Sequence, residues 1–159
     1  MSGEQSNSFM ARAIQLSLEN VRLGRGGPFA ALVVKDGRVI SEGTNLVTSE
    51  NDPTAHAEIV AIRRACLALA TFQLTGCEIY ASCEPCPMCL GAIYWARLDR
   101  LFYACQAEDA ARAGFDDSLI RAELSLPHQG RRIPMLQLMR EEGLAAFEAW
   151  MANPNKIPY

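Results

Sequence analysis

The sequence has no excess of basic residues. Its 15 lysines and arginines stand against 18 aspartates and glutamates, and the formal net charge is −3. A protein that binds a phosphate backbone usually presents a basic face, because counterion release supplies much of the affinity. The adjacent basic pairs Arg63-Arg64 and Arg131-Arg132 have no aromatic residues interleaved and are interpreted as solvated surface. The composition therefore argues against nucleic acid as a partner and favours a small molecule.

The sequence also lacks long apolar runs. None approaches the roughly 20 residues of a membrane span, and residues 1–8 are small and polar, unlike the apolar core of a secretory signal. We therefore expect a cytoplasmic protein with no membrane partner. In that compartment the six cysteines should stay reduced, which favours metal ligation and burial over disulfides.

Histidine is scarce, with only His56 and His128 present. His56 opens the motif His-Ala-Glu that ends at Glu58, and about thirty residues later comes Pro-Cys-Pro-Met-Cys, which contains Cys86 and Cys89. Together they offer one imidazole, two thiols and one carboxylate. This set can hold zinc with three protein ligands and leave the fourth position to water. His128 lies in a polar loop and is interpreted as a surface residue.

Each motif has a plainer interpretation when taken alone. His56 could be a satisfied core histidine, and the two cysteines could be a redox pair or buried thiols. Cys83 adds a third alternative, because Cys83, Cys86, Cys89 and His56 could form a closed structural zinc site without room for water. Against this, Cys83 ends the preceding predicted strand, and Glu58 would then have no purpose. We favour the open site, with a non-catalytic zinc module as the alternative.

The hydrophobic pattern predicts a single α/β domain over residues 1–159. Helices are predicted over 6–23, 54–70, 86–97, 108–113 and 141–152, and strands over 29–34, 38–43, 78–82, 101–105 and 133–139. A turn at Asp36-Gly37 joins the first two strands, and Asp52 or Thr54 is expected to cap the second helix. The order implies one sheet of about five strands, covered by helices on both faces.

At these motifs the chain resembles the cytidine deaminase superfamily of zinc hydrolases, whose signature is H-x-E…P-C-x-x-C. Within it the similarity is to the bacterial guanine deaminases, and the stretches that carry it are 27–29, 51–58, 82–95, 114–118 and Tyr159. The tRNA adenosine deaminases share the zinc motifs, but the Phe-Asp-Asp segment at 115–117, the acidic pI of about 5.4 and the Tyr-ended tail favour the guanine branch. The resemblance implies a three-layer α/β/α cytidine-deaminase-like fold with a mixed sheet.

The resemblance also implies a mechanism. Zinc (Zn2+) would be held by His56, Cys86 and Cys89, and a zinc-bound hydroxide would attack guanine to give xanthine and ammonia. Glu58 would shuttle the protons without binding the metal. Guanosine, cytosine and tRNA adenosine remain alternative substrates.

Five further residues receive roles from the resemblance. Phe29 would pack on the purine, Asn45 would offer a donor and an acceptor to its edge, and the backbone at Ala57 would contact the ring. Asp117 would bind the purine and assist proton transfer. Residues 140–159, ending at Tyr159, would close over the active site of a homodimer, either that of their own chain or, if the segments are exchanged, that of the partner subunit. The plainer interpretations are a core aromatic, a turn residue, a helix cap and a frayed chain end.

Overall fold

The computed structural model describes residues 3–159, and its contacts divide the chain into two compact units. The first unit ends at Asp117, and the second runs from Ser118 to Tyr159. Among the described residues, no helix has both the length and the apolarity needed to cross a membrane.

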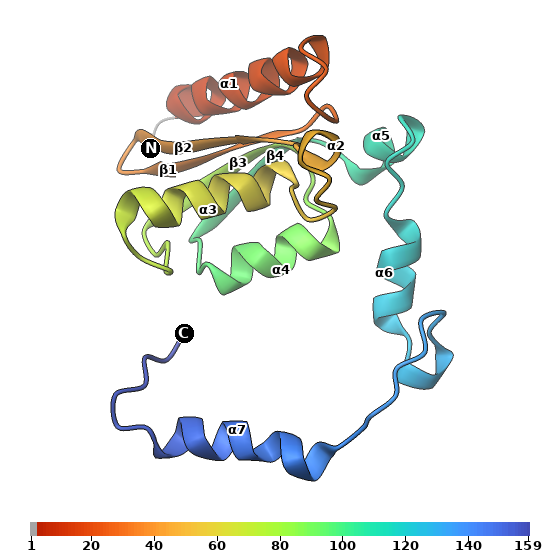
Figure 1. The fold of residues 1–159 in the computed structure, drawn as a ribbon. Helices are drawn as coiled ribbons and strands as arrows, with labels where there is room; N and C mark the ends of the chain where they lie inside the picture. Colours follow the sequence, from red (N-terminus) through yellow and green to blue (C-terminus); the bar gives the residue numbers. More distant parts are fainter. Residues whose placement is uncertain (1–2) are drawn as a thin grey trace. The chain divides into compact units, whose positions relative to one another are not determined.

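The first unit is built around one mixed sheet (Figure 1). Its elements are α1 (Gly3–Arg22), β1 (Ala30–Lys35), β2 (Arg38–Thr44), α2 (Val47–Glu50), α3 (Ala57–Leu69), β3 (Cys77–Cys83), α4 (Pro87–Trp95), β4 (Arg100–Cys105) and α5 (Ala107–Arg112). The strand order is β2-β1-β3-β4; β1 runs antiparallel to both neighbours, and β3 and β4 are parallel. The expected mixed sheet is confirmed.

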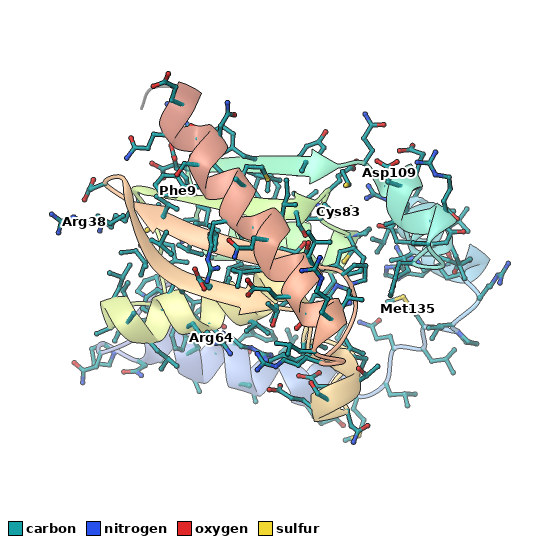
Figure 2. The ribbon with its side chains drawn as sticks, turned by 90° about the horizontal axis from the view of Figure 1, so that it is seen from above. Phe9, Arg38, Arg64, Cys83, Asp109 and Met135 are labelled. Carbon is teal, nitrogen blue, oxygen red and sulfur yellow. The ribbon has the colours of Figure 1, made fainter. Side chains whose placement is uncertain are left out.

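Both faces of this sheet are covered, because β1 alternates between two cores. One core lies under α1 and joins Ala30, Leu32 and Val34 of β1 to Phe9, Ala13 and Leu16 of α1. The other lies under α3 and joins Ala31 and Val33 of β1 to Ala57, Ala61 and Ala65 of α3. Figure 1 shows α1 on one side of the sheet with α3 and α4 on the other, and Figure 2 shows α1 lying across its face. The first unit therefore has three layers.

One turn and one close backbone contact fix where β2 lies. Asp36 and Gly37 have φ values of 49° and 72°, so the predicted hairpin turn is confirmed. At the other end of β2, a Cβ on Gly43 would overlap the carbonyl oxygen of Ala57 and lie 2.5 Å from the backbone nitrogen of Ala61. Glycine therefore lets the first turns of α3 approach β2 closely.

The prediction of about five strands is wrong, since the described residues contain a sheet of four. Residues 133–139, the predicted fifth strand, form no regular structure. Pro134 removes a backbone donor there, and Ile133, Leu136 and Leu138 are each at least 80% exposed, so this run has neither a ladder nor a covered face.

The second unit consists of α6 (Ser118–Ser125), a 3-10 turn η1 (His128–Gly130) and α7 (Arg140–Ala152). The sequence pattern predicted α7 but missed α6 and, in the first unit, the short α2. None of the residues from 118 to 159, all of which are described, is buried. This unit therefore has no hydrophobic core of its own.

Candidate metal centre and active site

Two helices of the first unit begin at the candidate site. His56 is the N-cap residue of α3 and Cys86 that of α4, and both have extended backbone. Their carbonyl oxygens accept the first helical bonds, from Val60 at 3.0 Å and Leu90 at 2.9 Å. Pro87 occupies the first turn of α4, where a missing backbone N–H costs no helical bond. Since α3 and α4 contact each other, these matched starts bring their side chains together.

The expected cap of the second helix is wrong, because α3 begins at Ala57 and its N-cap is His56 rather than Asp52 or Thr54. Instead, one carboxylate oxygen of Asp52 accepts the backbone N–H of Thr54 at 2.8 Å and its hydroxyl at 2.7 Å. This turn leads the chain into α3. The His56 side chain makes no capping bond and faces the thiols of α4.

The imidazole and two thiols form a compact group. His56 Nδ1 lies 3.6 Å from Cys86 Sγ and 3.5 Å from Cys89 Sγ, and the three atoms all lie within 4.8 Å of one another. Zinc bonds of about 2.0–2.1 Å to nitrogen and 2.3 Å to sulfur, set at tetrahedral angles, place those ligand atoms about 3.6 Å apart. The group therefore fits a zinc ion, with Nδ1 as the histidine ligand atom.

The two thiols differ in their readiness to ionise. A hydrogen bond from Cys89, assisted by His56, lowers the pKa of Cys86 to about 4. The same bond, together with burial, raises the pKa of Cys89. A hydrogen bond with Cys86 in turn raises the pKa of His56. The first thiol is therefore held as the thiolate that a metal requires, at the N-terminus of a helix, which favours negative charge.

Glu58 is the second residue of α3 and is 8% exposed. Burial raises the pKa of its carboxyl, and the charge of Cys86 raises that pKa further, while its own backbone N–H opposes the shift. Among residues 3–159, the metal-ligand group contains His56, Cys86 and Cys89 but not Glu58. Glu58 is therefore a carboxyl beside the metal group that can hold a proton.

Cys83 does not join this group within the described chain. Its thiol donates a 3.5 Å hydrogen bond to the carbonyl oxygen of Gln106, and burial, with Cys105 adding, raises its pKa to about 11. Figure 2 shows Cys83 on the side of the sheet toward α5, where Asp109 lies. This geometry supports the open three-ligand site over the closed four-ligand alternative.

Phe29 precedes β1 and is partly buried against the core that contains Ala57. Its ring meets Phe115 edge-on, with ring centres 4.9 Å apart and planes at 86°. Phe115 was not among the predicted site residues, although it lies in the 114–118 stretch that carried the resemblance. The structure thus places one predicted aromatic residue against a second that the sequence did not single out.

Asn45 follows β2 and is 6% exposed. Its Oδ1 accepts the backbone N–H of Gly27 at 3.2 Å and that of Val47 at 3.3 Å, and its own N–H donates to the carbonyl oxygen of Phe29 at 3.0 Å. Within the described part of the chain, no hydrogen bond involves its Nδ2. The amide therefore keeps its donor for another group, while its acceptor is bound to the backbone.

The last two predicted site residues end the two units. Asp117 is the last residue of the first unit and is partly buried, and Tyr159 ends the second with 71% of its surface exposed. Both make interactions within the chain. Their roles toward a substrate stay predictions.

Comparison with known proteins identifies the family. The profile of the cytidine and deoxycytidylate deaminase zinc-binding region matches residues 3–105. Guanine deaminase of Bacillus subtilis is 55% identical over 152 residues, which covers 96% of this chain and 97% of that protein. A crystal structure of the enzyme from that organism superposes with a TM-score of 0.94 at 53% identity, covering 100% and 99% of the two chains.

Two further relatives are more distant. A guanine deaminase structure from Nitrosomonas europaea has a TM-score of 0.68 at 34% identity, covering 74% of this chain and 66% of that one. The tRNA-specific adenosine deaminase of Agrobacterium fabrum is 49% identical over 79 residues, or 50% of this chain and 52% of that protein. On the profile match and the full-length similarity together, the chain belongs to the cytidine and deoxycytidylate deaminase zinc-binding family.

Proposed function

We propose that this protein is a zinc-dependent guanine deaminase, which converts guanine and water to xanthine and ammonia. The observation that carries the proposal is the group of His56, Cys86 and Cys89 with the buried carboxyl of Glu58 beside it. It stands in a chain that matches guanine deaminase along 96% of its length. The zinc motif supports the reaction type, and the full-length match supports the substrate.

In this proposal His56 Nδ1, Cys86 and Cys89 hold the zinc ion. When bound, zinc supplies the activation that lets water attack a carbon centre at neutral pH. Glu58 takes one proton from that water and delivers it to a ring nitrogen of guanine. It then transfers the proton of the added hydroxyl group to the 2-amino group, which leaves as ammonia as the C2 carbonyl forms. The burial that raises the pKa of Glu58 suits a carboxyl that must take up and return a proton.

The same proposal gives the neighbouring residues substrate contacts. Phe29 packs on the purine, with its ring orientation supported by Phe115. Asn45 presents Nδ2 as a donor, so it suits an acceptor on the purine edge. Ala57, in the first turn of α3, offers a backbone N–H that lacks an intrahelical acceptor. Asp117 binds the purine and assists the second proton transfer, which is to the leaving amino group.

Adenosine in tRNA is the alternative substrate with a specific observation behind it, because the Agrobacterium tRNA deaminase matches half of this chain. That match does not extend along the chain as the guanine deaminase match does. The net charge of −3 also disfavours binding to a polyanion. Guanosine and cytosine would use the same zinc chemistry in a pocket of different size.

Ammonia release by the zinc-loaded protein tests the proposal. Guanine, guanosine, cytosine and adenine are given in parallel, with tRNA as a fifth sample at low and raised salt. We expect strong release from guanine alone. Turnover of another compound without guanine would keep the zinc mechanism and reject the substrate, while silence in all five would favour a structural zinc module.

We also propose that the protein is a homodimer in which residues 140–159 of one chain close over the active site of the other. The second unit supports this, since Phe147, Trp150 and Met151 of α7 are each more than 40% exposed and none of its residues is buried. Apolar surface of that extent is typical of an interface. Tyr159 then belongs to the active site as its last residue.

A complementation experiment tests whether the tail is exchanged. Tyr159→Ala and Glu58→Gln chains, each impaired alone, are mixed after dissociation and allowed to reassociate. If tails are exchanged, mixed dimers hold one complete site, and equal mixing restores about a quarter of wild-type sites. No recovery, with mixed dimers demonstrated by native mass spectrometry, would show that each tail serves its own chain.

A further inference from the structure

Asn20, near the C-terminal end of α1, makes contacts that the proposed mechanism does not explain. It is 2% exposed, and its Nδ2 donates 2.9 Å hydrogen bonds to the carbonyl oxygens of both Gly27 and Asn45. Its Oδ1 is buried without a hydrogen-bond partner among the described residues. The orientation of the amide is fixed, since turning it over would set an oxygen against two carbonyl oxygens. An unpaired buried oxygen is destabilising, so stability alone does not account for an amide here.

Asn20 joins two segments that are also hydrogen-bonded to each other, at the residues proposed to contact the substrate. The N–H of Gly27 donates to Asn45 Oδ1, and the N–H of Asn45 donates to the carbonyl oxygen of Phe29. The N–H of Phe29 donates at 2.8 Å to the carbonyl oxygen of Gly27, which also accepts from Asn20. Through its bonds to Gly27 and Asn45, Asn20 thus fixes the backbone that orients Phe29 and the amide of Asn45.

The packing around this backbone leaves little room for adjustment. A Cβ on Gly27 would lie 3.2 Å from the ring of Phe29 and 3.3 Å from that of Phe115. A Cβ on Gly26 would overlap the carbonyl oxygen of Asn45 and lie 2.9 Å from its Oδ1. A small displacement of residues 26–27 therefore moves both the aromatic pair and the Asn45 amide.

We infer that Asn20 is a positioning residue for substrate binding, which acts through Gly27 and Asn45 on the contacts that Phe29 and Asn45 make with a purine. The identity of the ligand rests on the proposed function, whereas the positioning of residues 27–29 and Asn45 rests on the hydrogen bonds of Asn20 alone. Asn20 contacts neither the metal group nor Glu58 by any hydrogen bond in the described chain. Its loss therefore weakens binding of the purine more than it slows proton transfer.

The test replaces Asn20 by leucine, which has a similar size. Leucine removes the unpaired Oδ1 but also the donor to the carbonyl oxygen of Asn45, so one unpaired buried oxygen replaces another. We expect Asn20→Leu to bind zinc and keep its Tm, to raise KM for guanine roughly tenfold and to change kcat less, as loss of uniform binding does. Amide hydrogen exchange at Gly27 and Asn45 should accelerate about tenfold through local opening. Asn20→Asp, which lacks the donors, gives a second variant in case leucine does not fold.

Ser17→Ala is the matched control. Ser17 is also a buried polar residue of α1, but its hydroxyl bonds to the carbonyl oxygen of Ile14 and not to the substrate segments. It should leave KM and exchange unchanged.

Two outcomes separate this inference from the proposed function. Wild-type turnover of guanine, with KM and exchange unaltered in both Asn20 variants, would overturn the positioning role and leave the enzyme assignment intact. If the wild-type protein is inactive on guanine but amide exchange at Gly27 and Asn45 is faster in the Asn20 variants than in the wild type, guanine is rejected as the substrate and the positioning role is supported.

Discussion

The two units of this chain use apolar residues in opposite ways. In the first unit they fill two cores, one on each face of a four-stranded sheet formed by the described residues. In the second unit, residues 118–159, none is buried, although α7 alone exposes Phe147, Trp150 and Met151. A core can stabilise a fold, whereas uncovered apolar surface needs a partner. The first unit therefore has cores that can stabilise it, whereas the second offers the uncovered apolar surface that the proposed dimer would bury.

The strongest test compares two buried cysteines of the first unit. Cys89→Ser removes a metal ligand and should cost zinc and turnover, on the order of 10³-fold or more in kcat/KM. Cys83→Ser should keep both, because that thiol bonds to the carbonyl oxygen of Gln106 rather than to the metal group. Zinc content and guanine deamination are measured on the same samples. Loss of zinc in Cys83→Ser would revive the closed structural site.

Matched leucines test the contrast between a core and an uncovered surface. Leu32 is 0% and Leu136 is 83% exposed. Leu32→Ala should lower the free energy of unfolding by about 2–5 kcal/mol at any protein concentration. Leu136→Ala should change it by less than about 0.5 kcal/mol in dilute protein. Urea unfolding at two protein concentrations measures both free energies. If the two substitutions lowered the free energy of unfolding equally in dilute protein, the difference between the units would be contradicted.

Association itself gives a smaller expected effect. Phe147 in α7 and Leu18 in α1 are both apolar and exposed, at 68% and 52%. If the second unit supplies the interface, Phe147→Asp should raise the dimer Kd by roughly 30-fold, as loss of an aromatic interface residue does. Leu18→Asp should leave the Kd unchanged. Sedimentation velocity measures the two, and the reverse order would place the interface on α1.

The sequence predicted the features that depend on local chemistry. His56, Cys86 and Cys89 were chosen because a metal needs those donor atoms, and the structure brings the three together. The Asp36-Gly37 turn was predicted because few other pairs tolerate two positive φ values, and both are positive.

The errors arose where tertiary contacts decide. Asp52 and Thr54 have the side chains of helix caps, but they bond to each other, and His56 starts α3 with its imidazole turned to the thiols. Residues 133–139 are apolar like a strand, yet Pro134 and the lack of a neighbouring strand within the described chain leave them irregular.

The supporting contacts of the site could not be predicted. Asn20 looks like an ordinary polar residue near the end of a helix, and its role depends on Gly27 and Asn45, which are 7 and 25 positions away. The pairing of Phe29 with Phe115 likewise joins distant segments. Such contacts follow from the completed fold and leave no local pattern in the sequence.

The most direct test of the account compares wild-type protein with Glu58→Gln for zinc content and for xanthine formed from guanine. We predict equal zinc, because Glu58 is not in the ligand group, and a fall in kcat of about 10²–10⁴-fold, the range of general acid–base catalysis. Equal zinc with undiminished xanthine formation in Glu58→Gln would contradict the role of Glu58 and with it the proposed mechanism.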